Sequence, residues 1–190
     1  MAITRITSTA ITSVASTAIS GTLPAANINN TSIGNVTALP AGVGGKVIQM
    51  VTAGGFAGAS VSSQSNVTTN IKTSITPTST SNKIYIHITS VCSQVAYGTR
   101  SSDFAGVTLT RNIGGAGATT IRGGGNNDFL SVYQLSTHSF HTPVALSYVD
   151  TTYNSTSSIE YELLSRVETS GESTYWNGGF GGRITIMEIA

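Results

Sequence analysis

Aromatic and amide side chains near the C-terminus form the segment of this sequence best suited to contacting another molecule. Tyr175, Trp176 and Asn177 are consecutive, and two glycines follow them. Tyrosine and tryptophan present flat apolar faces with a polar handle, which stack on sugar rings or anchor a protein partner. Asn-Gly is a strong hairpin signal, so we expect a tip between two strands here. An alternative stays open, because Trp176, the only tryptophan, could instead fill the core or a contact between subunits.

Tyr153 and Asn154 form a second, weaker candidate of the same kind, in a polar stretch between two strand-like segments. Both segments would lie in loops of the fold, where binding residues are often found. The candidate contacts with a receptor, a glycan or another subunit are therefore Tyr175, Trp176, Asn177, Tyr153 and Asn154.

Patterns that would support catalysis or metal binding are weak. His138 and His141 have the spacing that grips a metal on a helix, but in a strand these two positions point to opposite sides. Glu160 and Glu162 alternate with apolar residues, as on a solvated strand face, and do not resemble a glycosidase pair. Cys92 follows β-branched residues and has no basic neighbour, which favours a buried thiol. We expect no catalytic residues, no metal site and no cofactor, and so a protein that is not an enzyme. One alternative for a metal stays open, in which three copies of His138 or His141 meet at the axis of a trimer.

The low content of charge is the main compositional feature of the 190 residues. Charged residues make up 9% of the chain, while 26 Ser and 29 Thr account for much of the rest. The net charge of +1 gives no field that would attract nucleic acid or an anionic membrane surface. No stretch approaches the roughly 20 apolar residues that cross a bilayer. We therefore expect neither a nucleic-acid partner nor insertion into a membrane.

Alternation of apolar and polar residues dominates from Lys46 to the C-terminus and predicts an all-β domain over residues 46–190. Helix-forming residues are scarce, and turn signals recur every 8–15 residues. This pattern predicts an antiparallel β-sandwich, jelly-roll-like in type. The expected strands cover residues 46–51, 67–75, 83–91, 105–111, 129–135, 143–149, 159–163 and 184–187, and a glycine-rich run interrupts them at residues 114–125.

Residues 1–45 differ from the rest and predict an extended N-terminal arm. Arg5 is their only charged residue, and isolated aliphatic side chains are separated by small polar ones. Such a segment has too little apolar area to fold alone, so its aliphatic residues need neighbours such as copies of themselves. A flexible Ser/Thr/Gly linker is the alternative. The candidate attachment and assembly residues are Ile3, Ile6, Ile11, Ile19, Ile28 and Ile33.

Three short motifs give the sequence a family resemblance. They are residues 45–51 (GKVIQMV), residues 74–84 (SITPTSTSNKI) and residues 184–189 (ITIMEI). Together they resemble a domain common in fibre and tail proteins of marine bacteriophages, especially those of cyanobacteria. Residues 23–28 (LPAANI) and 32–35 (SIGN) are similar to the connectors that precede that domain.

The resemblance implies a virion structural protein, often a homotrimer, without enzymatic activity. We expect a short fibre that is assembled in the host cytoplasm and located in the virion. The arm would bind other virion proteins, and the β-sandwich would contact further copies or a host surface polysaccharide. Two alternatives stay open: a head or tail decoration protein without a receptor role, and a lectin-like module that binds glycans.

Overall fold

The computed structural model describes residues 46–95, 103–123, 130–134, 140–168, 170–177 and 181–190. The chain divides into two units, Met1–Val43 and Gly44–Ala190, and all described residues belong to the second. The six isoleucines of the expected arm lie outside the described residues. Within the described part, every regular element is a strand.

The strands follow one another in an all-β order, as the sequence predicted. They are β1 (Val47–Gly54), β2 (Ala59–Val61), β3 (Val67–Ile75), β4 (Lys83–Val95), β5 (Asp103–Ile113), β6 (Ala118–Arg122), β7 (Leu130–Gln134), β8 (Phe140–Asp150), β9 (Ile159–Val167), β10 (Ser173–Trp176) and β11 (Arg183–Ile189). Burial alternates strictly along β9, because one face of the strand points into the core and the other points outward.

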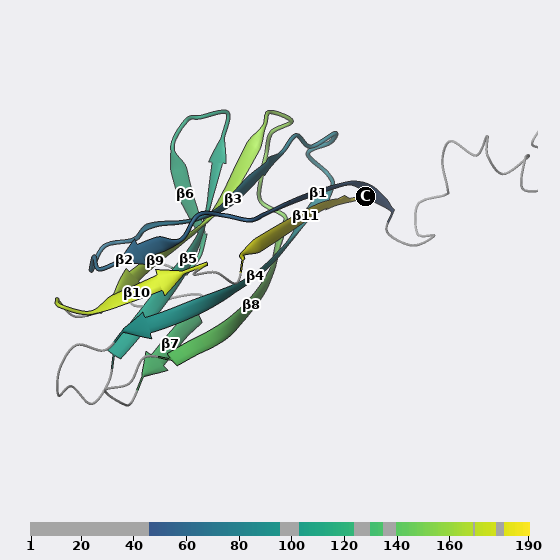
Figure 1. The fold of residues 1–190 in the computed structure, drawn as a ribbon. Helices are drawn as coiled ribbons and strands as arrows, with labels where there is room; N and C mark the ends of the chain where they lie inside the picture. Colours follow the sequence, from purple (N-terminus) through teal and green to yellow (C-terminus); the bar gives the residue numbers. More distant parts are fainter. Residues whose placement is uncertain (1–45, 96–102, 124–129, 135–139, 169, 178–180) are drawn as a thin grey trace, which may run out of the picture. The chain divides into compact units, whose positions relative to one another are not determined.

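The strands form two antiparallel sheets (Figure 1). In sheet A, β8 pairs with one side of β4, and β11 and β10 pair in succession with the other side. Strand β1 then pairs with β11, and β2 pairs with β10. In sheet B the order is β3, β9 and β5, and β7 and β6 pair in succession with the far side of β5.

This arrangement is a jelly roll built from interrupted strands. If β1 with β2, β6 with β7, and β10 with β11 each count as one broken strand, each sheet has four strands. Numbered along the chain, their order is 1-8-3-6 in sheet A and 2-7-4-5 in sheet B, which is the jelly-roll order. The predicted β-sandwich of jelly-roll type is therefore confirmed.

Apolar side chains from both sheets meet in one core. Sheet A contributes the buried face of β4 and β11, and sheet B contributes that of β9 and β5. The largest fully buried side chains are Trp176, Tyr161, Ile71, Ile75, Ile84, Ile86, Ile88, Leu109, Ile159, Leu163, Ile184 and Ile186. Cys92 is also fully buried, and burial raises the pKa of its thiol to about 12, as expected for an inert structural cysteine.

A buried ion pair joins the two sheets at one end of the core. The Arg111 guanidinium of β5 donates to both carboxylate oxygens of Asp150 at 2.9 and 2.7 Å, and the Tyr161 hydroxyl donates to Asp150 at 2.9 Å. Burial raises the pKa of Asp150, but hydrogen bonds from Thr152, Arg111 and Tyr161 outweigh it, and the net pKa is lowered. The carboxylate is therefore charged and matched by its donors.

A second buried carboxylate fixes the turn between β3 and β4. Glu188 of β11 accepts hydrogen bonds from the Thr78 backbone N–H at 2.8 Å, from the Asn82 amide at 2.7 Å and from the Gln49 amide at 2.6 Å. The Thr78 hydroxyl and the Ser79 N–H complete the set at 2.8 and 3.3 Å. We refer to this cluster as the Glu188 latch. It ties the turn to β1 and β11, two strands that are distant from it in sequence.

Three strands escaped the sequence analysis. Strand β6 lies inside the glycine-rich run, for which we expected a long hairpin or a loop, and its antiparallel pairing with β5 forms a hairpin. Strands β2 and β10 are only three and four residues long. Strand β6 forms because Gly114 and Gly115 take positive φ angles of 58° and 78°, and the Ala116 N–H donates to the Ile113 carbonyl at 3.1 Å. These φ signs match a type I′ turn, which closes a tight hairpin between β5 and β6.

Candidate functional site

Trp176 is a core residue and not a surface contact. Its side chain is fully buried at the end of β10 and belongs to the core cluster. The expected contact with a glycan or receptor is therefore wrong for Trp176, and the alternative of a core plug is confirmed. A hairpin tip at this point is also wrong, because β10 and β11 do not pair with each other. Both pair with the same side of β4, Trp176 opposite Cys92 and Arg183 opposite Thr89.

Asn177 lies at the break between β10 and β11, and its buried side chain fixes the backbone there through hydrogen bonds. It is 3% exposed and has a positive φ of 63°, a conformation that asparagine tolerates better than most residues. Its amide donates to the Thr69 carbonyl at 2.9 Å, and its side-chain oxygen accepts from the Ser90 hydroxyl at 2.8 Å. The expected surface role of Asn177 is wrong, since these bonds use its polar atoms inside the protein.

Tyr153 is likewise buried, with 2% of its surface exposed. Its hydroxyl lies 2.9 Å from both the Ser79 and the Asn82 carbonyl oxygens, so it supports the same turn as the Glu188 latch. The interpretation of Tyr153 as a contact residue is therefore wrong. Asn154, the next residue, is exposed.

Tyr175 is the exposed aromatic residue of its segment, at 40% exposure. Its ring lies against Gly58, where a Cβ atom would collide with the tyrosine hydroxyl. Tyr175 is paired with Ser93 near the end of β4, whereas Asn154 follows the residue that supports the turn before β4. About ten residues of extended strand separate these positions, or about 30 Å. The five predicted contact residues therefore do not form one site.

The two described histidines, His87 and His141, do not belong to a metal-binding cluster. His138 lies outside the described residues, and His141 is exposed on β8, with its Nδ1 2.5 Å from the Ser93 hydroxyl. His87 stacks beside Tyr85 on β4, and its Nδ1 lies 2.9 Å from the Ser147 hydroxyl. Among the residues that the structure describes, no group of three or more His, Cys, Asp or Glu side chains could hold an ion.

Exposed apolar side chains gather on the outer face of sheet A. Strand register aligns Met50 with Met187, Met187 with Tyr85, and Tyr85 with Val149. We call these four residues the apolar row. Met50 is 62% exposed and Val149 is 45% exposed. At neighbouring strand spacings of about 4.8 Å, the row crosses four strands over about 14 Å.

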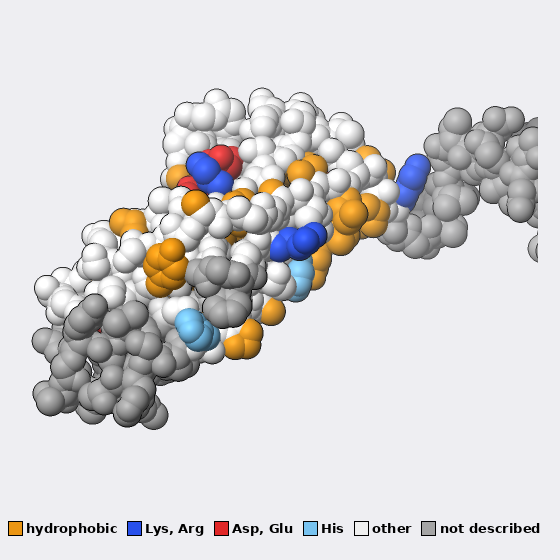
Figure 2. Space-filling model, viewed as in Figure 1, with side chains coloured by type: hydrophobic (Ala, Val, Ile, Leu, Met, Phe, Trp, Pro, Cys, Tyr) orange, Lys and Arg blue, Asp and Glu red, His pale blue; other side chains and the backbone are white. Residues whose placement is uncertain are grey.

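Two more apolar residues extend this surface toward the start of the module. Val47 and Ile48 are 51% and 37% exposed, and Val47 pairs with Ile189. Figure 2 shows orange side chains over the part of the module where β1 and β11 lie. Of the five large hydrophobic side chains exposed in the described part, Met50 and Val149 belong to the apolar row and Val47 pairs beside it, while Ile48 lies next to Val47 at the register irregularity between Val47 and Gln49. Such a concentration is typical of an interaction site and not of scattered surface residues.

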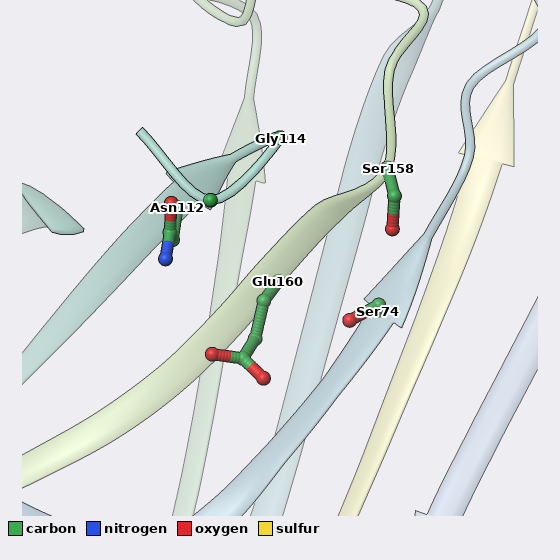
Figure 3. Close-up of a pocket in the computed structure, with 6 residues that line it drawn as sticks. Ser74, Asn112, Gly114, Ser158 and Glu160 are labelled. Atoms are coloured by element: carbon green, nitrogen blue, oxygen red, sulfur yellow. The ribbon is translucent and has the colours of Figure 1, made fainter. Parts of the chain in front are cut away.

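A small polar hollow lies on the opposite side of the sandwich, on the outer face of sheet B. It has a volume of about 240 Å³ and is lined by Ser74, Asn112, Gly114, Gly115, Ser158 and Glu160 (Figure 3). Register places Glu160 between Ser74 on β3 and Asn112 on β5. Three neighbouring strands thus bring a hydroxyl, a carboxylate and an amide to one level, and Ser158 lies just before β9.

Neither surface was found from the sequence. The apolar row takes one residue from each of four strands, and the hollow combines three strands with the turn after β5. Glu160 and Glu162 do share the outer face of β9, as predicted, with Glu160 3.5 Å from the Lys72 ammonium. The alternation showed which face each residue takes but not which residues become neighbours across strands.

Comparisons with known proteins add no family assignment: no protein-family model matches the chain, and no curated protein matches it significantly. In the described part of the structure, no helix is long and apolar enough to span a membrane.

Proposed function

We propose that the protein is a non-enzymatic structural component of a bacteriophage virion, a short fibre that assembles with copies of itself. Residues 1–45 would attach it to other virion proteins, and the jelly-roll module would pack against the same module of another copy. The sequence motifs support the assignment to a virion. The observation that carries self-association is the exposed apolar surface formed by the apolar row with Val47 and Ile48.

A second copy of this chain is the partner that fits this surface best. In the described part of the chain, β1 is an end strand of sheet A and pairs on one side only. Its other edge is therefore available for pairing with another polypeptide. Residues 1–45 join the module at Lys46, next to Val47. If the arms of several copies come together, the adjoining apolar surfaces also come together. Burial of exposed Met50 and Val149 would then offset the entropy lost on association.

Low charge supports the same proposal. A free monomer with only 9% charged residues has little electrostatic protection against association. In a chain that is permanently assembled, this protection is unnecessary. A decoration protein of the head or tail would have the same features. Imaging of the labelled protein in intact particles distinguishes a short fibre from a decoration protein.

Light scattering coupled to size-exclusion chromatography of the full-length chain tests self-association. We expect a homotrimer at micromolar concentration, and we expect Met50→Glu to shift it to smaller species. Thr120→Glu is the matched control, because Thr120 is exposed on β6 of the other sheet. A monomeric wild-type chain would overturn the proposal. A Met50→Glu variant that stays trimeric would show that another surface forms the contact.

A further inference from the structure

We infer that the polar hollow on sheet B is a binding subsite for one neutral sugar residue. This inference goes beyond assembly and is independent of the apolar row, since the hollow lies on the opposite face of the sandwich. Occupation of one surface would not block the other.

The hollow is lined by hydrogen-bonding groups that the protein itself leaves available. Asn112 uses its side-chain oxygen to accept from the Gly117 N–H at 3.1 Å, which leaves its amide N–H groups free to donate. In the described part of the chain, the hydroxyls of Ser74 and Ser158 have no hydrogen-bond partner. In Figure 3 the Glu160 carboxylate lies between Asn112 and Ser74.

Glu160 is also available for a ligand. Its contact with Lys72 is 3.5 Å long, and the two side chains are 35% and 48% exposed. An ion pair of this kind is worth about 0–1 kcal/mol, so hydroxyl groups can compete for the carboxylate. By contrast, Glu162 on the same face already accepts a hydrogen bond from the Thr68 hydroxyl at 2.5 Å.

The chemistry of this set selects a polyhydroxylated, uncharged ligand. The carboxylate accepts hydrogen bonds, the amide N–H groups donate them, and the two hydroxyls can do either. Together these groups can bond the vicinal hydroxyls of a sugar, which both donate and accept. One carboxylate is too few for a calcium ion, and it repels an anion. Gly114 and Gly115 leave the main chain uncovered along one wall, because neither has a side chain to close the space. The volume of about 240 Å³ suits a single ring and not a longer chain.

Backbone amide NMR of the full-length protein with single sugars tests the site. The probes are glucose, galactose, mannose and N-acetylglucosamine, each titrated to about 100 mM, because an open site of few polar groups suggests affinities near millimolar. We expect at least one sugar to shift the signals of Asn112, Gly114, Gly115 and Glu160. If assembly makes the particle too large for this method, saturation-transfer difference spectra of the sugars report whether they bind, and the variants below locate the site.

Matched variants then locate the binding. Glu160→Gln and Asn112→Ala should each weaken binding at least tenfold, while Glu162→Gln, one step along the same face, should leave it unchanged. Circular dichroism checks that every variant is folded. The inference is overturned if none of the four sugars produces a saturable response, or if the response survives both Glu160→Gln and Asn112→Ala. Light scattering on the same samples reports self-association separately, so one proposal can fail without the other.

Discussion

Replacement of Glu188 by glutamine tests whether one buried carboxylate holds the β3–β4 turn against β1 and β11. All its hydrogen-bonding neighbours in the Glu188 latch are donors: two backbone N–H groups, one hydroxyl and two side-chain amides. Glutamine has nearly the same size, but it lacks the charge and replaces one acceptor oxygen with a donor NH₂. The donors of the turn all bond Oε1, and Gln49 of β1 alone bonds Oε2, so Glu188→Gln takes the acceptor from Gln49 and leaves the turn donors with a neutral, weaker acceptor.

The expected loss of stability at neutral pH is about 3 kcal/mol, since hydrogen bonds to a charged group contribute about 1.5–3 kcal/mol each and are partly replaced. For a domain of this size, 1 kcal/mol changes the melting temperature by about 2–4 °C. Glu188→Gln should therefore melt about 6–12 °C below the wild type. Differential scanning calorimetry at one fixed protein concentration measures this, because association also shifts the melting temperature.

The pH dependence gives a second, independent readout. Burial raises the pKa of Glu188, but the hydrogen bonds from Gln49, Asn82 and Thr78 outweigh it and lower the pKa from 4.5 to about 2. A carboxyl group with a lowered folded-state pKa stabilises fully above its unfolded pKa, and it loses that contribution as the pH falls from about 4.5 to about 2. After allowance for solvent screening, the gap between wild type and Glu188→Gln should narrow by about 1–2 kcal/mol over this range.

The reasoning fails if Glu188→Gln melts within about 2 °C of the wild type at neutral pH, or if the two proteins lose stability in parallel on acidification. Asp150 also has a lowered pKa, but it is present in both proteins and cancels in the comparison. Glu162→Gln is the control, since the Glu162 side chain is only partly buried and accepts one side-chain hydrogen bond. Glu162→Gln should lower the free energy of unfolding by less than about 1 kcal/mol.

Two further predictions concern buried polar groups. Asn177→Ala removes the bonds to Thr69 and Ser90 and places alanine at a positive φ, so urea unfolding should show a loss of about 3 kcal/mol, while exposed Asn154→Ala should change little. Equal stability of the two variants would contradict the buried role of Asn177. Cys92 is buried with its pKa raised to about 12, so a thiol reagent should modify it at least about a hundredfold more slowly in the native protein than in denaturant. Rapid labelling of the native protein would place Cys92 at the surface.

The strands that the sequence predicted are those with one buried and one exposed face. Strands β3, β4 and β9 show clear alternation, since a side chain every second residue enters the core. Strand β6 has mostly exposed residues and no such signal. It exists because the turn at Gly114 and Gly115 brings it back along β5.

The candidate contacts failed for a related reason. Asn177 is followed by glycine, and this local signal fits both a hairpin and a break within one edge of a sheet. Pairing with β4 favours the break over the hairpin, because β10 and β11 pair one after the other with the same side of β4. Strand β4 lies about 80 residues earlier in the chain. Trp176 is then directed into the core by its pairing with Cys92, a contact that no local pattern contains.

The motifs that carry the family resemblance meet in the Glu188 latch. Gln49 comes from the first motif, Thr78 and Asn82 come from the second, and Glu188 comes from the third. Their residue types follow from the requirements of one buried carboxylate, which needs nearby donors to remain charged. The motifs therefore carry information about the fold, and any family with this latch would retain them whatever its members bind. The motifs also supply Val47, Ile48, Met50 and Met187 of the proposed self-association surface, whereas Val149 of that surface and Glu160 and Asn112 of the hollow lie outside them.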